Sequence, residues 1–156
     1  MKNNKLLIMN GPGLSDLSNY NEMGYGHLTL DIVRKKCAET CKIFGLKMDF
    51  RQTDDEAELS RFLKDGIEDF DALIINPAGY SHVSSVDYTI YSSAIKTITR
   101  QNKPVIEVHI SNIFQQGVEN TKPIQVPKCE VGFVSGLGIH SYDLAIRAVN
   151  KKLRKN

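Results

Sequence analysis

A short strand-like segment carries three polar side chains at alternating positions. Glu107, His109 and Ser111 are two residues apart within the stretch 106–112, and alternate side chains of a strand point to the same face. A carboxylate beside an imidazole can transfer a proton. A carboxylate buried at the end of an apolar strand also costs free energy unless it has a partner. The spacing therefore predicts either a proton-transfer pair or a structural Glu–His pair.

Two further polar clusters follow apolar runs. The stretch 10–13 reads Asn-Gly-Pro-Gly, and the stretch 76–82 begins with Asn76 and ends with His82. Glycine lets the backbone approach a ligand closely, but no Lys-Ser/Thr pair follows residue 13, so a nucleotide P-loop is not indicated. Taken alone, the first cluster is equally well a tight turn, and His82 an ordinary surface histidine.

The elements that would position these residues follow from the apolar pattern. Runs of strand length lie at residues 6–9, 46–50, 72–75, 104–110 and 131–134. Helices are expected at about 28–44, after a capping-box pattern at 53–56, at about 85–101 and at 142–153. This alternation indicates an α/β protein with a parallel sheet covered by helices on both faces. We predict a flavodoxin-like three-layer sandwich with a five-stranded sheet of order 2-1-3-4-5, whose ligand site lies where the strands end.

Two long segments between these elements show no helix or strand pattern. They are residues 11–24 and 114–128, and loops of such length in a compact domain are usually functional or disordered. The first segment has glycines near both ends, so it could close over a ligand as a lid.

Bulk properties limit the classes of function. A chain of 156 residues suits one domain, residues 1–156. The formal net charge is +2, from 20 basic and 18 acidic residues, and the basic residues are scattered, so no nucleic-acid partner is expected. No apolar run is long enough for a membrane span. Three cysteines without a C-x-x-C pair indicate a reducing compartment, and we expect a cytoplasmic protein.

Dispersed motifs resemble those of one family, the type II 3-dehydroquinate dehydratases. In chain order they are Asn10-Gly11-Pro12, Tyr25-Gly26-His27, Phe50-Arg51-Gln52, 56–59, Asn76-Pro77, His82, 106–112 and Gly136-Leu137-Gly138. So many matches in order across almost the whole chain are a stronger signal than any single one. The resemblance implies the flavodoxin-like fold and an enzyme of the shikimate pathway that works without metal or cofactor. It also implies a homododecamer, a tetramer of trimers.

The resemblance assigns chemical roles to the catalytic candidates. It implies that Tyr25, in the lid, removes a proton from the carbon next to the ketone of 3-dehydroquinate and forms an enolate. Asn10 would help to hold a water molecule against that enolate. His109 would assist departure of the C1 hydroxyl, and Glu107 would orient His109. The product would be 3-dehydroshikimate.

The same resemblance assigns residues to substrate binding. Asn76 and His82 would hydrogen-bond the hydroxyls and ring substituents of the substrate. The backbone around Ile110 and Ser111 would receive its carboxylate. Asn120 stands where the family has an arginine that clamps the substrate.

The chain departs from the family pattern at residues that matter for charge. A phenol has a pKa near 10, so only about one in a thousand is ionised at pH 7 unless a cation is near. The family places an arginine five residues before the lid tyrosine, but this chain has Tyr20 there. The interval between Asn76 and Glu107 is also longer than usual by ~7 residues, about two helical turns. That insertion leaves Asp87 as a guess for the residue that reaches a neighbouring subunit's site.

Other functions remain open on the sequence alone. A relative that has lost the activity, or that binds another small polyhydroxy acid, would explain the missing arginines. A response-regulator receiver is set aside, because Asn10 and Asn76 stand where it needs acidic residues. A metal hydrolase could use three histidines and a glutamate, namely His82, His109, His140 and Glu107, but their spacing matches no standard metal site.

Overall fold

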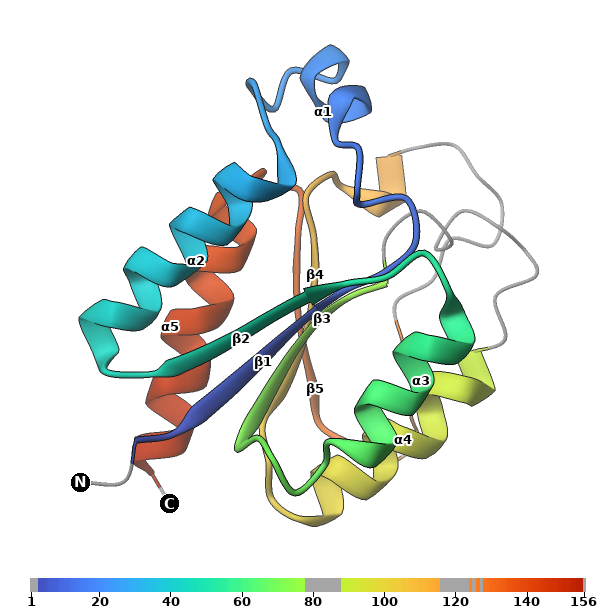
Figure 1. Ribbon diagram of the computed structural model, residues 1–156, viewed down its shortest axis with the longest axis vertical. Helices are drawn as coiled ribbons and strands as arrows, with labels where there is room; N and C mark the ends of the chain where they lie inside the picture. The colour runs from blue at the N-terminus through green and yellow to red at the C-terminus, as the bar shows by residue number, and fades with distance from the viewer. Residues whose placement is uncertain (1–2, 78–87, 116–123, 125, 127, 156) are drawn as a thin grey trace.

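A five-stranded parallel sheet forms the centre of the computed structural model, which describes residues 3–77, 88–115, 124, 126 and 128–155 (Figure 1). The strands are β1 (Lys5–Asn10), β2 (Lys47–Gln52), β3 (Ala72–Asn76), β4 (Val105–His109) and β5 (Val131–Ser135). Their order is β2-β1-β3-β4-β5, with every neighbouring pair parallel. The predicted flavodoxin-like sheet order is confirmed.

Helices cover both faces of the sheet. The helices are α1 (Ser18–Glu22), α2 (Leu30–Phe44), α3 (Glu56–Asp65), α4 (Tyr88–Arg100) and α5 (His140–Arg154), with a 3-10 turn η2 (Ile113–Gln115). Helices α2 and α5 pack on one face, and α3 and α4 pack on the other (Figure 1). Within the described residues, no helix is both long and apolar enough to cross a membrane.

Each central strand supplies apolar side chains to both helical layers. In β1, Leu6 and Ile8 belong to the core under α2 and α5, while Leu7 and Met9 belong to the core under α3 and α4. All residues of β3 and β4 are buried, as expected for strands covered on both faces. The apolar runs of the sequence therefore mark the interior of the sheet.

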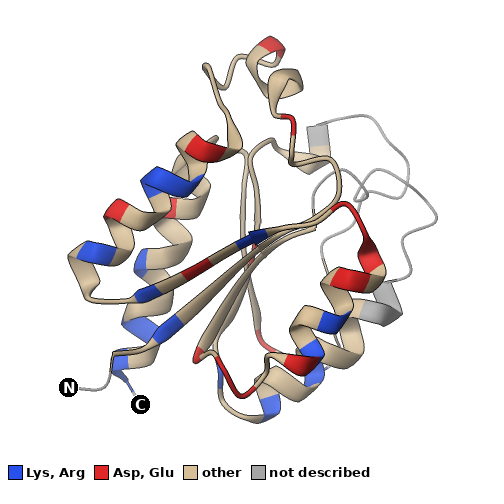
Figure 2. Ribbon diagram, viewed as in Figure 1, with Lys and Arg blue, Asp and Glu red and all other residues tan. Residues whose placement is uncertain are grey.

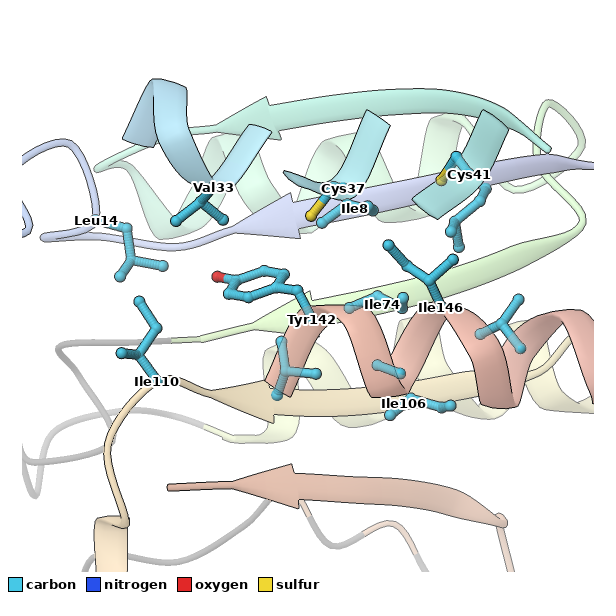
Figure 3. Packing of buried hydrophobic residues seen from close by; sticks show 14 of the residues in the cluster. Ile8, Leu14, Val33, Cys37, Cys41, Ile74, Ile106, Ile110, Tyr142 and Ile146 are labelled. Atoms are coloured by element: carbon cyan, nitrogen blue, oxygen red, sulfur yellow. The ribbon is translucent and has the colours of Figure 1, made fainter. Parts of the chain in front are cut away.

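Helix α2 begins and ends at residues that favour such boundaries. The Thr29 hydroxyl accepts a hydrogen bond from the Ile32 N–H at 3.1 Å, and Gly45 ends the helix with a φ of 67°, which glycine adopts without strain. Cys37 and Cys41 are free thiols buried on the inner face of this helix (Figure 3). Both side chains pack in the core under α2 and α5.

Two local expectations differ from the structure. The capping-box pattern places Thr53 at the start of the second helix, but Asp55 is the N-cap of α3 and accepts from the Ala57 N–H at 2.9 Å. Thr53 instead accepts from the Asp55 N–H at 3.1 Å and supports the turn before the cap. Helix α1 lies within the segment that the sequence predicted to be irregular. The helix could not be recognised in the sequence because it spans only 5 residues and has neither a side-chain cap nor a buried face.

The strand order predicts a ligand site between β1 and β3. The chain moves outward from β1 to β2, then crosses back to β3, so the direction of strand addition reverses between these two strands. Asn10 and Asn76 end the two strands and are paired in register there. In open α/β sheets, ligands bind outside the carboxyl ends of the strands at such a reversal.

Candidate active site

Five of the predicted site residues come together at the carboxyl edge of the sheet. Asn10, Asn76, Glu107, His109 and Ser111 lie on or directly after β1, β3 and β4, and each is at most 3% exposed. Polar side chains are seldom buried so completely without a specific role.

Glu107 and His109 form a close pair on β4. The His109 Nε2 atom lies 3.2 Å from the Glu107 Oε2 atom. The two atoms are close enough for an ion pair but are not oriented for a hydrogen bond. Neither atom has a hydrogen-bond partner among the described residues. The second carboxylate oxygen, Oε1, accepts from the Ile124 N–H at 2.7 Å. The carboxylate is thus held from one side and presents its other oxygen to the imidazole.

Aromatic rings flank His109 on the side of the edge strand. The Phe133 ring centroid lies 5.9 Å from that of His109, and the Phe114 ring lies 5.8 Å from that of Phe133. Both phenylalanines are exposed, Phe114 by 63% and Phe133 by 38%. They form an apolar wall that shields one side of the imidazole while remaining open to a ligand or another chain.

A tyrosine that sequence analysis missed joins the two asparagines. The Tyr142 hydroxyl, from α5, donates to Asn10 Oδ1 at 2.7 Å and accepts from Asn76 Nδ2 at 2.8 Å. Asn10 Nδ2 also donates to the Arg51 carbonyl at 3.0 Å. In the sequence, Tyr142 is the first apolar residue of an expected helix. No feature of the sequence indicates that its hydroxyl binds Asn10 and Asn76.

The loop after β1 is pressed against the end of β3. The Gly11 N–H donates to the Asn76 carbonyl at 2.7 Å, and a Cβ atom on Gly11 would lie 2.8 Å from the Pro77 carbonyl oxygen. A side chain would force these two backbone segments apart at the place where Asn10 and Asn76 are held.

We expect Gly11→Ala to lower the free energy of unfolding by about 1–3 kcal/mol, the usual cost of forcing an extra carbon into a packed region. The penalty arises because the new methyl group meets a backbone carbonyl that cannot rotate away. Urea denaturation followed by circular dichroism measures it. A change smaller than about 0.5 kcal/mol, the usual range for surface substitutions, would show that the loop can move away freely.

Tyr25, just after the segment predicted to form a lid, lies beside the backbone expected to bind a carboxylate. The Tyr25 hydroxyl accepts from the Asn112 N–H at 3.3 Å, and its ring packs against Gly138, whose own N–H donates to the Ile110 carbonyl at 3.0 Å. Gly138 has a φ of 61°, and a Cβ there would make a tight contact of 3.3 Å with the Tyr25 ring. The predicted base and the predicted carboxylate site are therefore neighbours.

Tyr20, in α1, lies close to Tyr25. The Tyr25 N–H donates to the Tyr20 carbonyl at 3.1 Å. Burial raises the pKa of the Tyr20 hydroxyl, and the nearby Tyr25 hydroxyl raises it further. A side chain at residue 20 is thus within electrostatic reach of Tyr25. No lysine or arginine occurs between Lys5 and Arg34, so α1 carries no positive charge of its own (Figure 2).

Three predicted residues lie outside the described residues, namely His82, Asn120 and Asp87. Across the part of the chain that the structure describes, no group of three or more His, Cys, Asp or Glu side chains could hold a metal ion. The described site is therefore built from amides, hydroxyls, backbone N–H groups and the Glu107–His109 pair.

Comparisons with known proteins agree with this geometry. The family model "Dehydroquinase class II" matches residues 4–150. A 3-dehydroquinate dehydratase from Clostridium botulinum (strain Langeland, type F) is 34% identical over 155 residues, 98% of this chain and 96% of that protein. A 3-dehydroquinate dehydratase from Phenylobacterium zucineum is 36% identical over 143 residues, 92% and 93% of the two chains.

Solved structures give the same result. The type II dehydroquinase from Propionibacterium acnes superposes with a TM-score of 0.77 at 28% identity, covering 97% of this chain and 98% of that one. A 3-dehydroquinate dehydratase-like protein from Bifidobacterium longum superposes with a TM-score of 0.69 at 31% identity, covering 96% and 98%. With matching sequence and fold over nearly its full length, this chain belongs to the class II dehydroquinase family.

Proposed function

We propose that this protein is a 3-dehydroquinate dehydratase, a hydro-lyase that removes water from 3-dehydroquinate to give 3-dehydroshikimate through an enolate. The observation that carries the proposal is the buried Glu107–His109 pair at the sheet edge, within a chain that belongs to the dehydroquinase family. A buried carboxylate beside an imidazole suits proton transfer to a leaving group.

The first step is removal of a proton. The ionised Tyr25 hydroxyl takes a proton from the carbon next to the substrate ketone, and the electron pair of that C–H bond moves onto the ketone oxygen to form an enolate. Asn10 lies at the end of β1 and would hold a water molecule against the enolate oxygen. Hydrogen-bond donors aimed at a developing oxyanion are a strong source of catalysis.

The second step is loss of the hydroxyl. The enolate electron pair returns and expels the C1 hydroxyl, which takes a proton from His109 and leaves as water. Glu107, 3.2 Å from His109, stabilises the positive charge of the protonated imidazole before this transfer. Protons and electrons balance once the proton on Tyr25 returns to His109 through solvent.

Binding groups complete the proposal. The backbone around Ile110 and Ser111 would receive the substrate carboxylate, while Asn76 and His82 would hold its ring hydroxyls. Asn120 stands at the position of the family's clamping arginine and would contribute a neutral hydrogen bond there. The proposed steps use only protein groups.

A steady-state assay with 3-dehydroquinate over a pH series tests the function. The product contains a conjugated enone, so its formation is followed by ultraviolet absorbance. We expect product formation by the native protein, with the rate rising as the pH approaches the range in which phenols ionise. A folded protein that forms no enone at any pH would instead support the alternative, a relative that binds another small polyhydroxy acid.

We propose a cytoplasmic, closed homo-oligomer, a homododecamer built from four trimers. Family resemblance supports the assembly, and so do Phe114 and Phe133, exposed aromatic rings beside the site. The three free cysteines suit a reducing compartment. Light scattering at micromolar concentration should give a mass near twelve chains. A trimer would show that the trimers do not assemble further, and a monomer would contradict the proposal.

A further inference from the structure

We infer that Tyr142 is a positioning residue that fixes the orientation of both asparagine amides at the site, an inference that rests on the proposed function. Asn10 and Asn76 end adjacent strands and are paired in register, and both of their amides bind the one hydroxyl of Tyr142. This hydroxyl comes from α5, 132 residues along the chain from Asn10.

The hydrogen-bond pattern defines which edge of each amide faces inward. A phenol hydroxyl has one hydrogen to donate, and Asn10 Oδ1 receives it at 2.7 Å. The Tyr142 hydroxyl oxygen in turn accepts a hydrogen bond from Asn76 Nδ2 at 2.8 Å. Tyr142 thus binds the Oδ1 atom of Asn10 and the Nδ2 atom of Asn76. The Nδ2 atom of Asn10 and the Oδ1 atom of Asn76 consequently point away from Tyr142.

The remaining contacts of Asn10 show what this orientation provides. An amide nitrogen carries two hydrogens, and the Arg51 carbonyl accepts one of those on Asn10 Nδ2 at 3.0 Å. The second Nδ2 hydrogen is directed away from this carbonyl. It is a donor near the place where a water molecule or enolate oxygen would bind. A rotated Asn10 amide would present an acceptor there, which repels an enolate.

Tyr142 is suited to hold this arrangement. Its ring lies in the core between α2 and the sheet, with the hydroxyl directed toward the carboxyl ends of the strands (Figure 3). The residue is 1% exposed. Burial raises the pKa of Tyr142 far above that of a free phenol, so the hydroxyl keeps its proton and remains a donor at every pH at which the protein works.

The test is Tyr142→Phe, which removes the hydroxyl and keeps the ring. We expect kcat/KM to fall about tenfold or more, because two buried amide groups lose a partner and can rotate. Tyr91→Phe is the matched control, since Tyr91 is equally buried but lies in the opposite core, where its hydroxyl bonds Glu56 at 3.3 Å. The control should leave kcat/KM near the native value.

A double-mutant cycle separates positioning from a general structural effect. In an Asn10→Ala background, Tyr142→Phe should lower kcat/KM by less than about threefold, because the hydroxyl has lost one of the amides through which it acts. If the two substitutions multiply as independent effects, Tyr142 does not act through Asn10 and the inference is wrong.

A measurement without substrate keeps this test separate from that of the proposed function. The side-chain amide protons of Asn10 and Asn76 can be assigned by NMR from their loss in Asn10→Asp and Asn76→Asp. We expect both sets of signals to shift and exchange faster in Tyr142→Phe but not in Tyr91→Phe. Unchanged signals would overturn the positioning role. Absence of turnover by the native protein would overturn the proposed function, and the NMR signals would still decide whether Tyr142 fixes the amides.

Discussion

Replacing His109 with alanine is expected to lower kcat for 3-dehydroquinate by about 10²–10⁴-fold, the usual contribution of a positioned general acid. The imidazole is 3.2 Å from the Glu107 carboxylate, and in the proposed mechanism it protonates the departing hydroxyl. Glu107→Gln should have a smaller effect in the same direction, since glutamine keeps an oxygen for the Ile124 N–H but cannot stabilise an imidazolium ion.

Stability must be measured alongside turnover, because both residues are buried. His140→Ala is a suitable control, since it removes an exposed imidazole from the start of α5. Near-native kcat in His109→Ala would show that this residue is not the acid. An unfolded His109→Ala protein would mean that the Glu107–His109 pair serves mainly to hold the structure.

Tyr20→Arg is expected to raise turnover at pH 7 by about 10-fold to 10³-fold, because a nearby opposite charge commonly lowers a pKa by ~1–3 units. An arginine at residue 20 would favour the ionised form of the lid phenol and would disfavour its neutral form. More of the Tyr25 hydroxyl would then be ionised at neutral pH. The rise of kcat/KM with pH should therefore begin at a lower pH than in the native protein. Measuring kcat/KM from pH 6 to 10 tests both the direction and the size of this shift.

Tyr20→Phe is the control for this experiment, because it keeps the packing of Tyr20 against the core and adds no charge. Its pH profile should stay close to the native one. Strong native activity at pH 7 that Tyr20→Arg leaves unchanged or lowers would show that a cation outside the lid already activates the base.

The sheet and the edge that carries the candidate site could be predicted, because strands covered on both faces are written in the sequence as short runs of apolar residues. Strands β3 and β4 are buried along their whole length and are mostly apolar, and the polar residues near their carboxyl ends must meet at one edge of a parallel sheet. Glu107 and His109 followed from a spacing of two within one strand. Tyr25 and the asparagines depended on family resemblance.

Features that depend on tertiary contacts could not be predicted in this way. Tyr142 looks like a core residue in sequence, and its partner Asn10 lies 132 residues away. Helix α1 has no apolar period, and the choice of Asp55 over Thr53 as N-cap depends on where the chain turns after β2. The constraint on Gly11 arises from the carbonyl of Pro77, which follows the end of a different strand, β3.

The rate at which the two cysteines of α2 are chemically labelled measures how often the core opens. Burial raises the pKa of the Cys41 thiol to about 11 and that of Cys37 still further, and only the thiolate reacts with alkylating reagents. Modification of these two thiols therefore reports transient unfolding, whereas Cys129, which is partly exposed, can be modified in the native state. Mass spectrometry after timed labelling would give the opening rate of each active-site variant with no added probe.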